Sequence, residues 1–406
     1  MNLRDYQTAI AFKGASMLQE LGIIYLALQT RTGKTITALE ICRLIKADHV
    51  LFVTKKKAIS SIESDYRHYH DHFICTIINY ESVSKVTGPF DVAVIDEAHS
   101  VASYPKPSKR YKDLKRFTNA IPCILMSATP SPESYSQLYH QFTINKYHSW
   151  NKSKNFYHWA KYYVNKQIKY LYGREIPDYS DARVDMVNHA TDKYFITLSQ
   201  TEAGIEQQIT EQVLYCDMSD MTQEMITRLR IDKVIEVNGS AILADTAVKE
   251  MSKIQQLSSG SVKLEDGSVL MVDKSKAEFI RDYFKEQRIV IFYKFIGELQ
   301  ILTEVFDNCT SSPDEFQSGK SNVFLGQFLS AREGIRLDTA DAIIFYNIDF
   351  AYLSYEQSKN RIVSKERTKT ARLYWVFNKK GIEQQIYNVV RKKSDYTVNY
   401  YKQWQQ

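Results

Sequence analysis

Short apolar runs separated by helical stretches recur between residues 23 and 127, and they constrain the fold more than any other feature of the sequence. The runs are Ile23–Leu28, His49–Thr54, Cys75–Tyr80, Val92–Asp96 and Cys123–Ser127. Short, continuous and β-branched runs are typical of strands that are buried on both faces. Because helical patterns lie between most of the runs, this half of the chain is predicted to form a parallel sheet covered by helices.

The alternation breaks near residue 146 and resumes near residue 274. Between them the chain is aromatic and basic at 147–172, rich in turn formers at Gly173–Pro177 and helix-like at Met221–Val237. Further predicted strands are Arg288–Tyr293, Ser321–Phe328, Ala342–Asn347 and Arg372–Phe377, and predicted helices are Lys276–Glu286, Ile296–Phe306, Ser354–Ile362 and Ile382–Arg391. We therefore expect an α/β chain with a parallel-sheet lobe at 1–145, a mostly helical insertion or connector at 146–270 and a second parallel-sheet lobe at 271–406.

A candidate phosphate-binding loop joins the first predicted strand to a helical pattern at Ile36–Ile45. It reads Thr30-Arg31-Thr32-Gly33-Lys34-Thr35. A strand, a tight turn and a helix place backbone N–H groups at a helix start, where the helix dipole favours an anion. In such a loop Lys34 reaches the β- and γ-phosphates of a nucleotide and the Thr35 hydroxyl binds Mg²⁺. Leu28 stands where the full pattern has its first glycine, so the loop alone is a weak signal.

An acidic pair follows a second apolar strand. Phe90–Ile95 runs directly into Asp96-Glu97-Ala98-His99. On a sheet that carries a phosphate loop, an acid at a strand end holds Mg²⁺, which is the role expected of Asp96. The adjacent Glu97 would orient and deprotonate the attacking water. Either segment alone could be a solvated turn, but the two signals in this order favour a nucleotide-hydrolysing site.

Composition and charge narrow the class of protein. Hydrophobic residues make up 44% and charged residues 25% of the 406 residues, as in an ordinary globular protein. The net charge of +6 is compatible with nucleic-acid binding but does not require it. The five cysteines form no Cys-x-x-Cys pair, so neither a zinc site nor a disulfide framework is indicated. Since no run resembles a signal peptide or a membrane span, we expect a cytoplasmic protein that does not bind a membrane.

Nearly the whole chain resembles superfamily 2 helicases, and within them the Swi/Snf-like translocases, most of all the compact bacteriophage type. The matching segments of the first half are Arg4–Gln7 (the glutamine motif), Thr30–Thr35 (the phosphate loop, or Walker A motif), Phe52–Lys55, Ile78–Ser82, Asp96–His99 (the DEAH box), the basic run Pro107–Lys115 and Ser127–Pro130. Those of the second half are Lys253–Gly260, Val290–Phe295, Ser330–Leu337 and Gln357–Arg361. The pattern departs at Arg31, where most relatives have a small residue, and at Ser364, where the family has a second arginine that Arg367 could replace.

The resemblance implies an enzyme that uses ATP and Mg²⁺, with four groups of site residues. Catalytic residues would be Lys34, Asp96, Glu97, Arg361 and Arg367, the arginines being candidate fingers that offset charge on the transferred phosphoryl group. Nucleotide contacts would be Gln7 at the adenine edge, Thr30, Arg31, Thr32, Gly33, Lys34, Thr35 and Gly334, with Thr35 and Asp96 also at the metal. Nucleic-acid contacts would be Thr54, Lys55, Asn79, Ser330 and Arg332, and the residues that couple the two sites would be His99, Ser127, Thr129 and Gln357.

The function implied is that of an ATP-dependent DNA translocase or helicase. ATP would lie between the lobes, and its hydrolysis would shift an open–closed equilibrium that moves them along duplex or branched DNA without reading its sequence. An RNA helicase, or a motor subunit serving a partner nuclease or replisome, are the alternatives. We expect a monomer with a replication or recombination protein as a further partner. The basic run 106–116 is left open as a solvated loop or a DNA contact, and the aromatic residues at 147–172 are expected to pack an accessory lobe.

Overall fold

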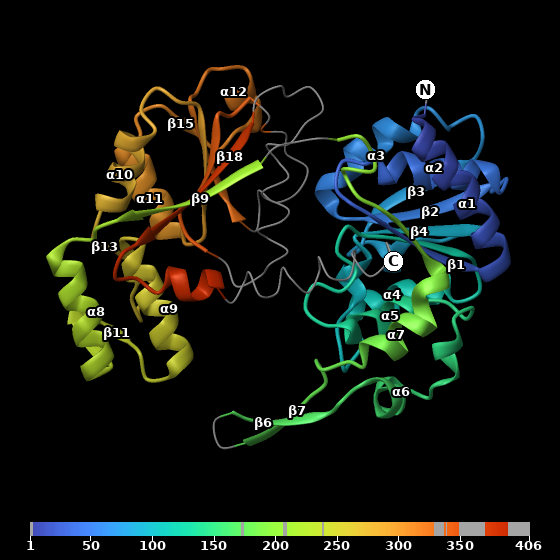
Figure 1. Cartoon of the computed structure of the whole chain (residues 1–406), viewed down its shortest axis with the longest axis horizontal. Coiled ribbons are helices and arrows are strands. Elements are labelled where there is room, and N and C mark those ends of the chain that lie inside the picture. Colours follow the sequence, from blue (N-terminus) through green and yellow to red (C-terminus); the bar gives the residue numbers. More distant parts are fainter. Residues whose placement is uncertain are drawn as a thin grey trace. The chain divides into compact units, whose positions relative to one another are not determined.

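A computed structural model of the chain describes residues 3–171, 174–205, 209–237, 239–328, 337, 339–348 and 370–388. They belong to two compact units, one holding residues 3–205 and the other residues 209–388 (Figure 1). Each unit is built around a parallel sheet, so the expected α/β class with two parallel-sheet lobes is confirmed. The expected boundaries at 145 and 270 do not coincide with this division, because the segment 146–270 supplies one strand to each sheet.

The sheet of the first unit has, within the described residues, six parallel strands in the order β3-β2-β4-β5-β1-β8. The strands are β1 (Ile23–Leu28), β2 (His49–Thr54), β3 (Ile74–Asn79), β4 (Val92–Asp96), β5 (Cys123–Met126) and β8 (Phe195–Leu198). The first five lie within one residue of the predicted runs. β8 was not predicted; it is a four-residue strand that pairs with β1 after a long segment of short helices and one antiparallel pair.

Helices cover both faces of this sheet (Figure 1). One face packs against α1 (Asp5–Leu21), α2 (Lys34–Leu44) and α3 (Ile59–Tyr66), and the other against α4 (Lys109–Thr118), α5 (Leu138–Phe142), α6 (Phe156–Tyr163) and α7 (Val184–Thr191). Side chains alternate between the faces along each strand. In β1, Ile24 and Leu26 join the first layer, whereas Ile23 and Tyr25 join the second. A strand with helices on both sides has no exposed face, which explains its uninterrupted apolar sequence.

The second unit has a parallel sheet in the order β15-β16-β14-β17-β18-β9. Its strands are β9 (Ile209–Cys216), β14 (Ile289–Tyr293), β15 (Cys309–Thr310), β16 (Val323–Gln327), β17 (Ala342–Phe345) and β18 (Ala371–Asn378). One face packs against α8 (Asp220–Asp232), α9 (Ala247–Ser258) and α12 (Pro313–Gln317), and the other against α10 (Ser275–Tyr283) and α11 (Ile296–Val305). The four predicted strands are all present, whereas β9 and the two-residue β15 are additions.

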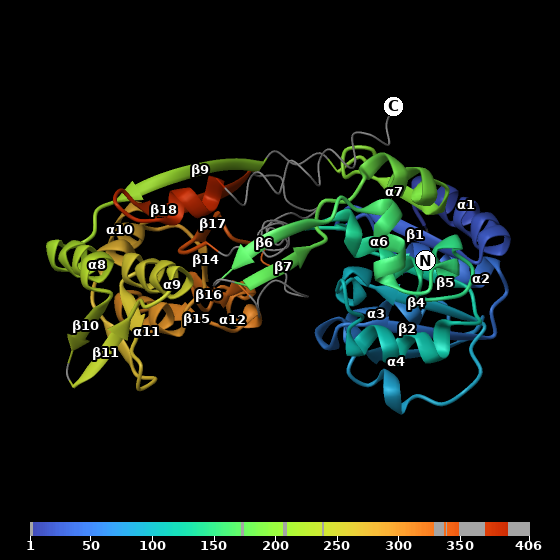
Figure 2. The ribbon, with the colours of Figure 1, turned by 90° about the horizontal axis from the view of Figure 1, so that it is seen from below.

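Short antiparallel pairs replace part of the helical connector that the sequence predicted (Figure 2). They are β6 (Gln167–Leu171) with β7 (Arg174–Asp178), β10 (Val234–Val237) with β11 (Ser240–Leu243), and β12 (Ser261–Lys263) with β13 (Val269–Met271). Trp150, Phe156 and Trp159 are packing residues, but they are buried in the core of the first unit and not in the separate accessory lobe that was expected. The predicted helix Ser354–Ile362 lies outside the described residues, and residues 383–388 of the last predicted helix are helical. None of the described helices is long and apolar enough to span a membrane.

Candidate functional site

The predicted polar residues of the first unit meet at one edge of its sheet. Lys34 follows the loop after β1, and Thr54, Asn79 and Asp96 are the last residues of β2, β3 and β4. Ser127 comes directly after β5. Because the strands are parallel, all their carboxyl ends lie on the same side, where open α/β sheets bind ligands. Five segments that are far apart in the sequence therefore contribute to one site, which we call the carboxyl-edge site.

The loop between β1 and α2 has a backbone that only small residues adopt easily. Arg31 has φ +66° and Gly33 has φ +85°, so both lie in the left-handed region. A Cβ atom at Gly33 would also lie 2.1 Å from Nε2 of Gln7. The amide and the hydroxyl of Thr37 donate to the Gly33 carbonyl at 3.1 and 3.0 Å and tie the loop to the first turn of α2. The left-handed conformation at Gly33 thus favours glycine, and a larger residue there would displace the end of the Gln7 side chain from the loop.

Side-chain amides hold this loop in shape. Gln7 donates from Nε2 to the Thr32 carbonyl at 3.2 Å, so the residue assigned to the adenine edge packs here on the loop. Gln200 donates from Nε2 to the Thr30 carbonyl at 3.0 Å, and its backbone N–H donates to Oε1 of Gln29 at 2.7 Å. Gln200 was not predicted as a site residue, because it follows the unpredicted strand β8 and belongs to no recognisable sequence pattern.

Lys34 turns its ammonium back toward the loop. Nζ donates to the carbonyls of Leu28 and Gln29 at 3.0 and 3.2 Å. Burial lowers the pKa of Lys34, and the nearby carboxylates of Glu97 and Asp96 partly oppose this shift. The cation is therefore already placed beneath the loop, where two carbonyl oxygens are its acceptors.

Asp96 is a partly buried acid whose charge is only partly balanced. Its Oδ2 accepts a hydrogen bond from the Thr54 hydroxyl at 2.7 Å. Burial, and then the charge of Glu97, raise the pKa of Asp96 to about 6, while the Thr54 hydrogen bond and Lys34 act in the opposite direction. In the described part of the chain no three His, Cys, Asp or Glu residues gather around a metal position. The donor set fits Mg²⁺ rather than zinc, since Mg²⁺ takes one or two carboxylates and completes its shell with water and phosphate.

A line of contacts leads from Glu97 to the turn after β5. Nδ1 of His99 lies 3.2 Å from Oε2 of Glu97 and 2.9 Å from Oγ of Ser127. Ser127 Oγ in turn accepts the backbone N–H of Thr129 at 3.0 Å. The resemblance assigned coupling to His99, Ser127 and Thr129 among the described residues. In the structure these three residues are linked by consecutive contacts.

Tyr80 supports the acidic turn, although the sequence analysis gave its side chain no role. Its buried hydroxyl donates to the Asp96 carbonyl. The Arg110 guanidinium lies 5.6 Å from the Tyr80 ring centre and pairs with Glu81 at 2.6 Å. The Asn79-Tyr80-Glu81 segment therefore fixes the backbone that carries Asp96 and Glu97.

The described residues expected to contact nucleic acid differ in their exposure to solvent. Thr54 is fully buried and gives its hydroxyl to Asp96, so its side chain positions the acid and is not exposed to a polyanion. Asn79 uses Oδ1 to accept the Ser82 N–H at 2.9 Å and is partly exposed, as is Lys55. The other predicted site residues lie outside the described part of the chain: Ser330, Arg332, Gly334, Gln357, Arg361 and Arg367.

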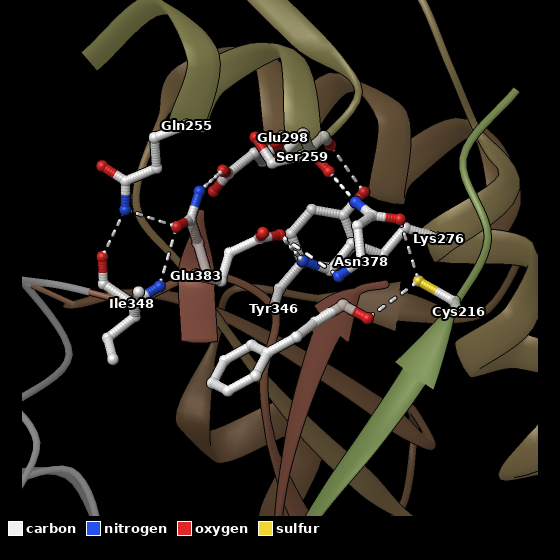
Figure 3. Close-up of polar contacts among 12 residues, drawn as sticks. Cys216, Gln255, Ser259, Lys276, Glu298, Tyr346, Ile348, Asn378 and Glu383 are labelled. Atoms are coloured by element: carbon white, nitrogen blue, oxygen red, sulfur yellow. Dashed lines mark hydrogen bonds and ion pairs between the residues drawn. The ribbon is translucent and has the colours of Figure 1, made fainter. Parts of the chain in front are cut away.

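A buried polar network occupies the corresponding edge of the second sheet (Figure 3). Nζ of Lys276 lies 3.2 Å from Oε1 of Glu383, and their side chains are only 2% and 1% exposed. Nearby, Gln255 donates to Oδ1 of Asn347 at 2.8 Å and accepts from Nζ of Lys294 at 3.1 Å. The segment that contains Gln255, singled out by resemblance alone, thus binds the residues that follow β14 and β17.

Comparisons with known proteins leave the function to be argued from the site. No protein-family model matches the chain, and no curated protein matches its sequence. Among solved structures, a Sulfolobus solfataricus SWI2/SNF2 ATPase core in complex with dsDNA is similar at 15% sequence identity and a TM-score of 0.42. The match covers 98% of this chain and 92% of that one. Similarity at this level is too low to transfer an activity.

Proposed function

We propose that this chain hydrolyses MgATP and uses the energy to move along or remodel DNA. The observation that carries the hydrolysis is the carboxyl-edge site itself. It joins a loop with a glycine in the left-handed region after β1, a partly buried lysine at the start of α2 and an acidic pair at the end of β4. Each of these features alone has a purely structural explanation, but together they supply the cationic and acidic groups that phosphoryl transfer from a nucleotide needs.

The loop and Lys34 would bind the phosphates. Lys34 now donates to two neutral carbonyls, and the oxygens of a polyphosphate are stronger, charged acceptors for the same ammonium. The N–H groups at the start of α2 add a positive dipole end to the same place. The low pKa that burial gives Lys34 would rise in the presence of this added negative charge.

Asp96 and Thr35 are the residues that would hold Mg²⁺. The pKa of Asp96 is raised by burial and by Glu97, and Lys34 only partly opposes this shift, so a divalent cation would supply the remaining counter-charge. When bound, the ion would offset negative charge on the phosphates. Thr54 keeps one oxygen of Asp96 engaged and so limits the rotation of the carboxylate.

Glu97 would take a proton from the attacking water. It has φ +51°, and its backbone carbonyl accepts a hydrogen bond from Tyr80 at 3.4 Å. His99 contacts both Glu97 and Ser127, so a change in the surroundings of Glu97 would be felt at the turn after β5. This contact gives a physical route by which hydrolysis could be linked to a track bound elsewhere on the unit.

DNA is proposed as the track because the ordered segments resemble those of Swi/Snf-like translocases. Lys55 and Asn79 lie at the same edge of the sheet as the acidic pair, where they could meet a phosphate backbone. The proposed contacts of Ser330 and Arg332, and the roles of Arg361 and Arg367 as arginine fingers, rest on the resemblance alone.

The proposal is tested by phosphate release from MgATP with a panel of duplex, forked, four-way and single-stranded DNA, and with RNA. We expect duplex or branched DNA to increase the rate, and Glu97→Gln to lower the stimulated rate by about 10²–10⁴-fold because the general base is lost. Stimulation by RNA alone would make the chain an RNA-dependent enzyme. Unchanged turnover in Glu97→Gln would remove the assignment of the base.

A further inference from the structure

The positive charge of the chain is concentrated in one stretch of the first unit. Residues 98–174 contain 13 Lys and Arg residues and only two acids, Asp113 and Glu133. This stretch therefore carries +11, although the whole chain carries only +6, so the rest of the chain is net negative. A local excess of positive charge of this kind is typical of proteins that bind a polyanion.

The structure gathers part of this charge around a groove of about 350 Å³. One wall is the loop at Pro105–Pro107 with α4, and the other is the segment 151–157 at the start of α6. Tyr104 and Phe156 join the walls by ring stacking, with centroids 5.9 Å apart. Lys115 links three segments that line the groove, because its Nζ donates to the Thr143 carbonyl at 2.7 Å and to Oδ1 of Asn151 at 3.3 Å.

The basic side chains at the rim of the groove form no ion pairs with other described residues. Lys106 and Lys154 line the groove from opposite walls and are exposed, as are Lys152 beside it and Lys112 and Arg116 on α4. Within the described residues none of these five side chains forms an ion pair; Lys109 has a long contact of 3.9 Å to Asp113. We call Lys106, Lys109, Lys112, Arg116, Lys152 and Lys154 the α4 basic surface.

The arrangement of charge on α4 costs stability. Its first turn holds no acid but three basic residues, Lys109, Arg110 and Lys112, at the end where the helix dipole disfavours cations. Lys112 and Arg116 are four apart and repel each other on one face of the helix. An external anion would turn both of these unfavourable terms into favourable ones.

We propose that the α4 basic surface binds the phosphate backbone of a nucleic acid, as a contact separate from the carboxyl-edge site. The choice of nucleic acid as the polyanion rests on the proposed function. It is favoured by the geometry too, because unpaired lysines spread over two walls suit a repeating backbone charge, and Tyr157, 43% exposed, adds an aromatic side chain to the groove. The surface would add affinity without reading sequence.

The test uses the full-length protein without nucleotide, so that its result does not depend on ATP hydrolysis. Binding of a fluorescent DNA duplex is measured by anisotropy across a salt series for wild type and for Lys106→Gln/Lys152→Gln/Lys154→Gln. If all three lysines contact phosphates, the slope of log K against log[salt] should fall by about 2.7 in magnitude, from ~0.9 per contact, and affinity near 0.1 M salt should fall at least roughly tenfold. Basal ATP hydrolysis without DNA should stay unchanged, because none of these residues lies in the carboxyl-edge site.

A matched control removes the same charge elsewhere. Lys13, Lys193 and Lys285 are exposed outside the surface, and their triple change to Gln should alter the slope much less. Equal loss in both triple variants would show that only net charge matters and would overturn the proposal, as would a surface variant that binds like wild type. A poly-glutamate peptide forms the last arm: if the surface variant loses this peptide but not DNA, the partner is an acidic protein and the proposal is wrong.

Discussion

At the scale of single residues, the carboxyl-edge site depends on an acid held in an unfavourable state. Asp96 is partly buried beside a second carboxylate, and its ionised form is stabilised by the Thr54 hydroxyl, by Lys34 and by a backbone hydrogen bond at Glu97. Catalytic groups are often perturbed in this way, since the surroundings that suit a bound ion or substrate do not suit the empty site. Two substitutions separate the roles of the acid and its hydrogen-bond donor.

Asp96→Asn should abolish ATP hydrolysis without lowering stability. The folded pKa of about 6 lies above the ordinary value of 3.8, so the folded state favours the protonated acid. The ionised group therefore disfavours folding above pH 6, and this penalty disappears as the pH falls through 6 toward 4. Asn removes the penalty and can still accept the Thr54 hydrogen bond. Thermal unfolding at pH 7.5 in EDTA should give an equal or higher Tm than wild type; a clear decrease in Tm would contradict the account.

Thr54→Val should shift the pH dependence of hydrolysis. The Thr54 hydrogen bond stabilises the ionised form of Asp96, and without it the pKa of Asp96 rises further. The acidic limb of the rate profile should therefore move to higher pH, with a several-fold loss at pH 7 that is largely recovered near pH 8.5 (one pKa unit corresponds to ~1.4 kcal/mol). If the profile keeps its shape while affinity for DNA falls, Thr54 is a nucleic-acid contact after all.

Some residues of the site could be predicted from the sequence and others could not, and the difference has a physical reason. Lys34, Asp96 and Glu97 lie in short patterns whose chemistry depends on local geometry, a turn or a strand end, so they could be identified from neighbouring residues alone. Gln200 and Tyr80 act through contacts between distant segments, with the loop at Thr30 and with the backbone of Asp96. The residues next to Gln200 and Tyr80 in the sequence do not indicate such contacts.

At the scale of secondary-structure elements, the second sheet is held by a buried ion pair between α10 and the segment after β18. Lys276 and Glu383 are almost completely removed from water, and Glu383 also contacts Asn378. Lys276 further lies 5.1 Å from the ring centre of Tyr346 (Figure 3). A charge in such a place is tolerated only while its partner is present.

Lys276→Met should therefore destabilise the second unit strongly, by roughly 3–5 kcal/mol, because Glu383 is left buried and unpaired. The control is Lys274→Met. Lys274 lies two residues before Lys276 and forms an ion pair with Glu304. That pair is exposed, at 46% and 42%, and its loss should cost at most about 1 kcal/mol. Urea unfolding followed by tryptophan fluorescence compares the two variants. Equal midpoints would show that the buried pair does not stabilise the sheet.

The elements themselves were predictable where burial on both faces leaves an apolar run. The strands β1, β2 and β4 have the bounds that the sequence predicted. β8 and β9 are edge strands on either side of residues 206–208, and β9 reads Ile-Thr-Glu-Gln-Val-Leu-Tyr-Cys, with polar residues among apolar ones. β8 is buried and apolar but has only four residues, and β9 mixes polar and apolar residues, so neither strand forms a recognisable apolar run within the long connector.

At the scale of the whole molecule, the chain consists of two α/β units, each with its own hydrophobic layers on both faces of a parallel sheet. The first unit carries the carboxyl-edge site and the α4 basic surface. We propose that the carboxyl-edge site hydrolyses ATP in response to DNA, and Lys34 is the residue that this activity would need most.

The most direct test is the rate of phosphate release from MgATP at saturating duplex DNA, for wild type, Lys34→Ala and the control Lys13→Ala. Lys13 is an exposed lysine on α1 that makes no contribution to the site. We predict DNA-stimulated hydrolysis in wild type and in the control, and a loss of at least about 10²–10³-fold in Lys34→Ala, because the cation that would stabilise the phosphates is gone. Undiminished DNA-stimulated turnover in Lys34→Ala would contradict the account.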